Sequence, residues 1–208
     1  MKTLLLTSAG MQVKEEILEI LPKSPSQTKV AHVVTASKGE KDTSYVVEDT
    51  KTMEGLGFQV ESIDIEGSSE DELRKLFERF DIIYVQGGNT FYLLKAVRES
   101  GFDKVVKEFI EQGKIYIGVS AGSILMGPTI ETANWGGADR NEAQIKDLNG
   151  LNFVPFLISP HYTKGDEELL KREISKWHYP VRFLTDAQAF LIQDDTITLV
   201  GKGAEIKL

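Results

Sequence analysis

The sequence contains no cysteine among its 208 residues. Disulfide bonds, cysteine-ligated zinc and a thiol nucleophile are therefore excluded together. Long apolar runs are absent as well. The apolar run at residues 4–6 is too short for the core of a signal peptide, and no stretch approaches the length of a membrane span. From these absences we expect a cytoplasmic protein.

Clustered positive charge is also missing. The chain has 24 Lys and Arg against 32 Asp and Glu, which gives a net charge of -8. Nucleic acids and anionic membranes are bound by clustered basic residues, so we expect neither as a partner. Neither Thr7-Ser8-Ala9-Gly10 nor the stretch 86–90 has the glycine spacing of a nucleotide-binding loop. No cofactor and no metal is expected, and the oligomeric state, monomer or homodimer, is left open.

The chain does contain a regular alternation of strand and helix patterns. Strands are predicted at residues 4–6, 29–35, 58–64, 81–85 and 114–119, and helices at 11–21, 42–56, 69–80, 91–98 and 102–112. Such alternation predicts an α/β fold with a mostly parallel sheet and helices on both faces.

The second half of the chain has a weaker pattern. Its predicted elements are an extended piece at 129–133, a loop at 134–149, a strand at 156–159, a helix at 166–177, a strand at 181–184 and a hairpin at 189–193 and 196–200. The length of the chain suits a single domain over residues 1–208.

A Gly-x-Ser-x-Gly pattern lies at the end of the strand at 114–119. It reads Gly118-Val119-Ser120-Ala121-Gly122 and is followed by an apolar segment that can begin a helix. A strand that turns sharply into a helix crowds its neighbours, and two glycines relieve that crowding. The pattern predicts a turn that exposes the Ser120 hydroxyl, although a loop merely rich in small residues would look the same.

A serine nucleophile needs a base, and the base needs an acidic partner. His161 and Asp186 both follow predicted strands, and ligands gather at the carboxyl ends of strands in a parallel sheet. His32 lies inside an apolar strand and His178 at a helix end, so His161 is the best candidate base. Asp186 is the candidate acid, and its alternatives are Glu131, Asp139, Glu142 and Asp147.

Acyl transfer also needs backbone donors for a developing oxyanion. Gly88, in Gln86-Gly87-Gly88-Asn89-Thr90, and Ala121, directly after the candidate nucleophile, are the candidate donors. The loop at 86–90 can equally be a tight turn in which Asn89 or Thr90 caps a helix. Asn89, Asn134 and Trp135 are the candidate substrate-binding residues.

Three stretches resemble the peptidase E family of serine peptidases, family S51, which includes the cyanophycinases. They are residues 86–91, residues 118–123, and residues 151–162 with Ser159-Pro160-His161-Tyr162. The resemblance implies a flavodoxin-like fold related to class I glutamine amidotransferases, with serine in place of cysteine. It also implies a Ser120 nucleophile, a His161 base, Gly88 and Ala121 as oxyanion donors, and an acid at Asp186 where peptidase E itself has glutamate.

Two departures from the family pattern concern the substrate. The aspartyl dipeptidases have an Asn-Asp pair where this chain reads Asn134-Trp135, and a longer, arginine-containing segment where it has Thr163-Lys164-Gly165-Asp166. Specificity for Asp-X dipeptides is therefore in doubt. We expect a serine-type peptidase that acts on short peptides. An esterase or amidase with the same site and a binding module without turnover are the alternatives.

Overall fold

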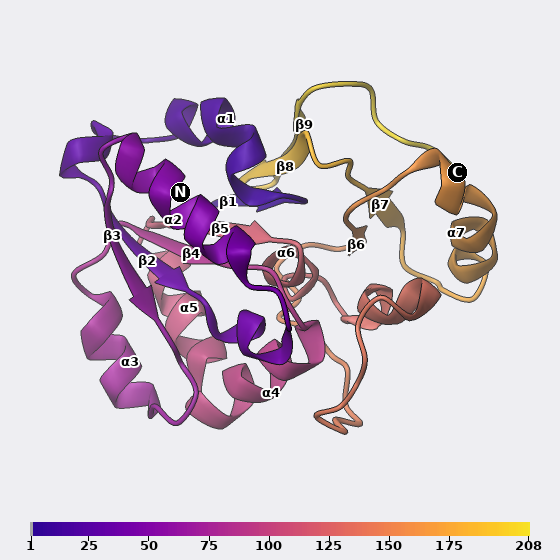
Figure 1. Cartoon of the computed structure of the whole chain (residues 1–208), viewed down its shortest axis with the longest axis horizontal. Helices are drawn as coiled ribbons and strands as arrows, with labels where there is room; N and C mark the ends of the chain where they lie inside the picture. Colours follow the sequence, from indigo (N-terminus) through magenta and orange to yellow (C-terminus); the bar gives the residue numbers. More distant parts are fainter. Residues whose placement is uncertain (1) are drawn as a thin grey trace.

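A seven-stranded sheet forms the centre of the protein (Figure 1). The computed structural model describes residues 2–208. The strands are β1 (Thr3–Thr7), β2 (Lys29–Val33), β3 (Gln59–Ile63), β4 (Ile82–Val85), β5 (Ile115–Val119), β8 (Gln188–Gln193) and β9 (Thr196–Gly201). Their order is β3-β2-β4-β5-β1-β8-β9. The first five pair in parallel, whereas β8 runs antiparallel to β1 and forms a hairpin with β9.

Helices cover both faces of this sheet. The helices α1 (Lys14–Glu19) and α2 (Ser44–Gly55) lie on one face, and α3 (Glu70–Phe77), α4 (Thr90–Ser100) and α5 (Phe102–Glu111) lie on the other (Figure 1). The predicted α/β fold, with its mostly parallel sheet and C-terminal hairpin, is thus confirmed. None of the helices within residues 2–208 is long and apolar enough to cross a membrane.

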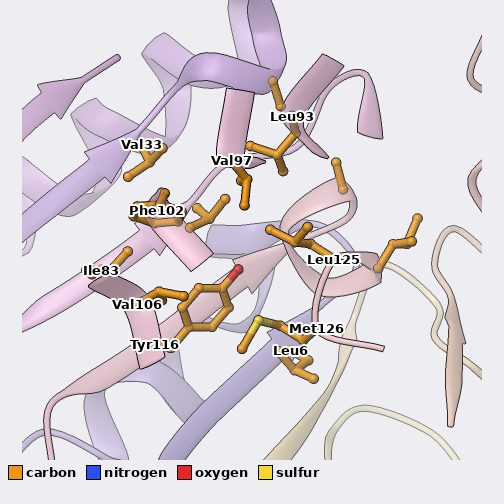
Figure 2. Packing of buried hydrophobic residues seen from close by; sticks show 14 of the residues in the cluster. Leu6, Val33, Ile83, Leu93, Val97, Phe102, Val106, Tyr116, Leu125 and Met126 are labelled. Carbon is orange, nitrogen blue, oxygen red and sulfur yellow. The ribbon is translucent and has the colours of Figure 1, made fainter. Parts of the chain in front are cut away.

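The two helical layers bury alternate residues of the strands. Leu4 and Leu6 pack with α4 and α5, whereas Leu5 packs with α1 and α2, and all three side chains are fully buried. Figure 2 shows Leu6 close to Tyr116 and Met126 in the larger of the two cores. Burial on both faces explains why β1 reads as a continuous apolar run instead of an alternating one.

Local capping sets the limits of two helices at the edge of this core. The Ser69 hydroxyl and the Glu72 carboxylate bond reciprocally to each other's backbone N–H, which begins α3 as a capping box. Gly101 ends α4 in the left-handed conformation, with φ 74°, and its N–H donates to the Val97 carbonyl oxygen. The boundaries predicted for these helices were therefore close to the observed ones.

A second, two-stranded parallel sheet lies beside the central one (Figure 1). It consists of β6 (Leu157–Ser159) and β7 (Val181–Phe183), which are connected through α7 (Glu167–Ile174). The sequence predicted both strands but not that they form a sheet of their own. A single domain over residues 1–208 stays a prediction.

The prediction of an extended piece at residues 129–133 is mostly wrong. Thr129 forms an isolated β-bridge with Asn149, but Glu131–Gly137 is a 3-10 helix. This helix is interrupted at Trp135 and Gly136, whose backbone angles are not helical. The polar loop predicted for 134–149 is otherwise observed, since it contains no strand and no α-helix.

Candidate active site

Ser120 lies at a sharp turn between β5 and the short helix α6 (Ala121–Ile124). Its φ of 45° and ψ of -103° are strained for a residue with a side chain. A Cβ atom on Gly118 would lie 2.6 Å from the Gly122 carbonyl oxygen, and one on Gly122 would lie 2.3 Å from the Val85 carbonyl oxygen. The strand and helix approach so closely that only glycine fits at either position, as the sequence pattern predicted.

The end of β1 holds this turn in place. The Ser120 N–H donates to the Thr7 carbonyl oxygen at 3.0 Å, and the buried Ser123 hydroxyl lies 2.8 Å from the same oxygen. The Thr7 hydroxyl donates to the Gly118 carbonyl oxygen at 2.9 Å and accepts from the Gly10 N–H at 3.0 Å. The strained backbone of Ser120 is therefore fixed on both sides, by the bond of its N–H to β1 and by the Ser123 and Ile124 N–H groups of α6, which donate to its carbonyl oxygen at 2.9 Å.

His161 follows β6 and brings its imidazole between Ser120 and Asp186. Its Nε2 lies 3.0 Å from the Ser120 Oγ, and its Nδ1 lies 2.7 Å from the Asp186 Oδ1. Leu184 follows β7, and Asp186 comes two residues later. It lies in a turn in which the Gln188 N–H donates a hydrogen bond to the Thr185 carbonyl oxygen. The structure thus brings together all three residues that the sequence proposed as catalytic.

For a neutral His161 ring beside an ionised Asp186, the hydrogen-bonding groups assign one tautomer. An ionised Asp186 carboxylate can only accept, so the proton of a neutral His161 ring lies on Nδ1. Nε2 is then an acceptor that faces the Ser120 hydroxyl, which donates to it. The His161 and Asp186 side chains are 52% and 60% exposed, so this chain of hydrogen bonds opens to solvent and to an incoming substrate.

The two candidate oxyanion donors are the N–H groups of Gly88, which lines the same cavity as Ser120, and of Ala121, the residue after Ser120. Gly88 has a φ of 132°, and a Cβ there would lie 2.5 Å from the Ala36 carbonyl, so the loop requires glycine. Among the described residues, the Gly88 N–H donates to no protein atom. Ala121 is the first residue of α6, where the N–H has no partner within the helix. Both groups are available to an oxyanion.

The other histidines lie in different environments. His32 is fully buried in β2, its Nδ1 lies 3.1 Å from the Thr50 hydroxyl, and burial lowers the pKa of the imidazole to about 4. His178 is exposed. Within residues 2–208, Asp186 is the acid that hydrogen bonds to His161. None of the alternative acids does so: these are Glu131, Asp139, Glu142 and Asp147.

A cavity of about 760 Å³ opens beside Ser120 and His161. Its wall includes five acids, which are Glu40, Glu48, Asp49, Asp139 and Asp166. No lysine or arginine is among the described residues that line it. Burial raises the pKa of the Asp139 carboxyl, and burial together with the charges of Asp139 and Glu142 raises that of Glu40.

The three candidate substrate-binding residues are placed differently around this cavity. Trp135 lines it, whereas Asn134 is exposed and outside its lining. Asn89 caps α4 through its Oδ1, which accepts from the Tyr92 N–H at 2.9 Å, and its Nδ2 donates to the Arg140 carbonyl oxygen. For Asn89, the capping role is the one that the contacts favour. No group of three or more His, Asp or Glu side chains suited to a metal ion occurs within residues 2–208.

Sequence reasoning missed Ser8, which contacts two of the three candidate catalytic residues. The Ser8 hydroxyl donates to the Asp186 Oδ1 at 2.8 Å and accepts from the His161 N–H at 2.8 Å. Its position directly after the first strand was the available signal, because β1 pairs with β5 and so ends at the same edge of the sheet.

The fold and this geometry define an α/β protein with a serine at a strand-to-helix turn and an imidazole and a carboxylate in line behind it. The chain belongs to peptidase family S51, whose model matches residues 4–200. It is therefore a peptidase, and a hydrolase by class. The resemblance seen in the sequence and the prediction of an enzyme are both confirmed.

Similar proteins include a Listeria innocua protein named uncharacterized peptidase Lin0382, which is 31% identical over 98% of this chain and 99% of its own. Peptidase E of a Nostoc species is 31% identical over 79% of this chain and 67% of its own. The crystal structure of a peptidase E candidate from Listeria monocytogenes EGD-e superposes with a TM-score of 0.87 at 30% identity, over 98% of this chain and 100% of that one.

Proposed function

We propose that this protein hydrolyses short peptides through an acyl-enzyme on Ser120, with His161 as general base and Asp186 as the acid that orients it. The observation that carries the proposal is the continuous line of contacts from the Ser120 Oγ to His161 at 3.0 Å and from His161 to Asp186 at 2.7 Å. These distances are within the range required for proton transfer from a nucleophile to its base.

The proposed reaction proceeds in two halves. The Ser120 oxygen attacks the peptide carbonyl carbon while its proton moves to the His161 Nε2, and the Gly88 and Ala121 N–H groups bind the oxyanion. The C–N bond then breaks, and the leaving amine takes the proton from His161. A water molecule next attacks the acyl-enzyme, gives its proton to the same nitrogen, and releases the carboxylic acid as Ser120 regains its proton.

The cavity supports a substrate that is not acidic. Its lining carries five acids and, among the described residues, no lysine or arginine that could pair with a substrate carboxylate. An aspartate side chain placed there would meet like charges in a partly desolvated cavity, which is unfavourable. We therefore include no Asp-X specificity in the proposed function and assign the cavity to neutral or positively charged groups of a short peptide.

A fluorophosphonate probe tests the proposed nucleophile directly, because it labels serine hydroxyls that a neighbouring base activates. We expect covalent labelling of the wild-type protein at Ser120, located by mass spectrometry of the digested product, and no labelling of Ser120→Ala. Ser100→Ala is the control, since Ser100 is a buried serine whose hydroxyl bonds within α4. Absence of wild-type labelling, or equal labelling of Ser120→Ala, would contradict the proposal.

A further inference from the structure

Ser8 lies where the central sheet meets the second sheet. It follows β1 directly and is fully buried, although the two side chains that it contacts, His161 and Asp186, are largely exposed. Ser120 is attached to the central sheet through β5, whereas His161 follows β6 of the second sheet, and Asp186 lies between β7 of the second sheet and β8 of the central one. The catalytic arrangement proposed above therefore depends on contacts that hold one sheet against the other.

The Ser8 hydroxyl makes two hydrogen bonds across this junction, one as donor and one as acceptor. Its single proton goes to the Asp186 Oδ1 at 2.8 Å, and one lone pair accepts the His161 N–H at 2.8 Å. The His161 Nδ1 also lies 3.3 Å from this hydroxyl oxygen. One buried hydroxyl thus contacts both the backbone and the ring of His161, together with the carboxylate oxygen that accepts from this ring.

The backbone of His161 needs such a restraint. Its φ of 58° is in the left-handed region, which a residue with a side chain adopts only when its surroundings hold it there. The Ser8 hydroxyl accepts the N–H of this residue, and the next N–H, that of Tyr162, donates to the Leu184 carbonyl oxygen at 2.9 Å. The two bonds tie His161 to the central sheet and to the segment after β7.

We propose that Ser8 is a positioning residue of this active site, which fixes the His161 ring and the Asp186 carboxylate relative to Ser120. The inference rests on the proposed function, because it assigns Ser8 a role through His161 and Asp186. Ser8 itself takes no part in bond making. Its donated hydrogen bond stabilises the ionised carboxylate, and the bond that it accepts sets the position from which the imidazole reaches Ser120.

The test measures the rate of fluorophosphonate labelling as a function of probe concentration. Ser8→Ala is expected to lower the maximal labelling rate about 10- to 100-fold, the effect of losing hydrogen bonds to a charged group and its partner. The probe concentration at half-maximal rate is expected to change less than about twofold, because the cavity is intact. Ser8→Cys replaces the hydroxyl by a larger thiol that is a weaker donor and acceptor, and it is expected to lose a similar factor.

A double-mutant cycle with Asp186→Ala separates positioning from general loosening of the fold. Once the carboxylate is removed, Ser8→Ala is expected to lower the remaining rate less than about threefold, because the two residues act through the same ring. Ser100→Ala removes another buried hydroxyl, one that bonds within α4, and is expected to keep the wild-type rate. It therefore shows how the loss of a buried hydroxyl affects the labelling rate when that hydroxyl does not contact His161 or Asp186.

The outcomes distinguish this inference from the proposed function. If the wild-type protein is not labelled at Ser120, the proposed function fails. If the wild type is labelled and Ser8→Ala or Ser8→Cys reacts at the wild-type rate, the role of Ser8 is overturned and the proposed function stands. Equal effects of Ser8→Ala with and without Asp186 would also overturn it, because they would show that Ser8 acts independently of the carboxylate.

Discussion

Gly118 and Gly122, four residues apart on either side of Ser120, are packed so closely that a Cβ atom on Gly118 would lie 2.6 Å from the Gly122 carbonyl oxygen. The Tyr116 hydroxyl donates to this same oxygen at 2.7 Å, within a fully buried environment. The turn that exposes the candidate nucleophile is therefore also a tightly packed part of the core.

Gly122→Ala is expected to destabilise the protein strongly. Its Cβ would lie 2.3 Å from the Val85 carbonyl oxygen, so β4 or α6 would have to move, and overpacking of this kind costs about 1–3 kcal/mol. Urea unfolding followed by circular dichroism measures the change. Gly55→Ala is the matched control: Gly55 lies in α2 with no atom within 4 Å of an added Cβ, and we expect it to be neutral or slightly stabilising.

Equal unfolding midpoints for Gly122→Ala and the wild type would contradict the packing around the turn. Labelling of Ser120 by a fluorophosphonate gives a second measurement on the same variant. A displaced α6 also moves the Ala121 N–H, so the labelling rate should fall even under conditions in which the variant is fully folded.

Asp186→Asn is expected to lower turnover by about 10²- to 10⁴-fold, the upper figure being the loss known for the same change in the chymotrypsin triad. An asparagine amide facing the His161 Nδ1 favours the other tautomer, in which Nε2 carries the proton and cannot accept the proton of Ser120. The labelling rate, or kcat on any peptide that is cleaved, measures the effect.

Asp195→Asn makes the same chemical change in the exposed turn between β8 and β9 and serves as the control. It should leave the rate unchanged. A rate for Asp186→Asn close to that of the wild type would show that Asp186 is only a turn residue, a common role for an aspartate that follows a strand.

The sequence predicted the central sheet well because each strand leaves a local pattern. The run Leu4-Leu5-Leu6 is buried on both faces, and the helices between strands carry apolar residues at helical spacing. Gly118 was informative for the same reason, since the Gly122 carbonyl that crowds it is only four residues away, whereas Gly122 itself is crowded by Val85 of the neighbouring strand β4.

What the sequence could not predict depends on contacts between distant segments. The strands β6 and β7 are three residues each, and nothing local shows that they pair with each other instead of joining the main sheet. The contact between Ser8 and Asp186 joins residues 178 positions apart. The acidic cavity likewise combines Glu40 and Asp139, which only the folded chain brings to one wall.

The acidic cavity predicts a preference among peptides. We expect peptides with lysine or alanine next to the scissile bond to be cleaved at least about tenfold faster than the same peptides with aspartate, because the cavity carries like charge. A panel of short peptides that differ only at this position, analysed by mass spectrometry, measures the ratio. Fastest cleavage of the aspartate peptide would contradict the assignment of the cavity.

Neutralising the cavity gives an independent measure of the same effect. Glu40→Gln combined with Asp139→Asn should reduce the discrimination against aspartate severalfold, and asparagine keeps an oxygen that can accept the Thr90 N–H now bound by Asp139. Glu15→Gln changes the charge by one unit on the exposed surface of α1 and should leave the ratio as it is.

The buried histidine predicts a dependence of stability on pH. Burial lowers the pKa of His32 to about 4 in the folded state, from 6.5 in the unfolded chain, so the unfolded state binds the proton first as the pH falls. The stability that this neutral ring contributes is therefore complete above about pH 6.5 and is lost progressively between pH 6.5 and 4. The loss is at most about 3 kcal/mol.

His32→Leu should remove that part of the pH dependence. The Thr50 hydroxyl donates to the Val46 carbonyl oxygen at 2.8 Å, so it keeps a partner without the imidazole, and the His32 Nε2 has no partner to lose. The free energy of unfolding, measured in urea at pH 7.5 and pH 4.5, is expected to fall less for the variant than for the wild type, by about 2–3 kcal/mol. Because all other titrating groups are common to both proteins, an equal fall in the two would show that His32 accepts a proton in the folded protein as readily as in the unfolded chain.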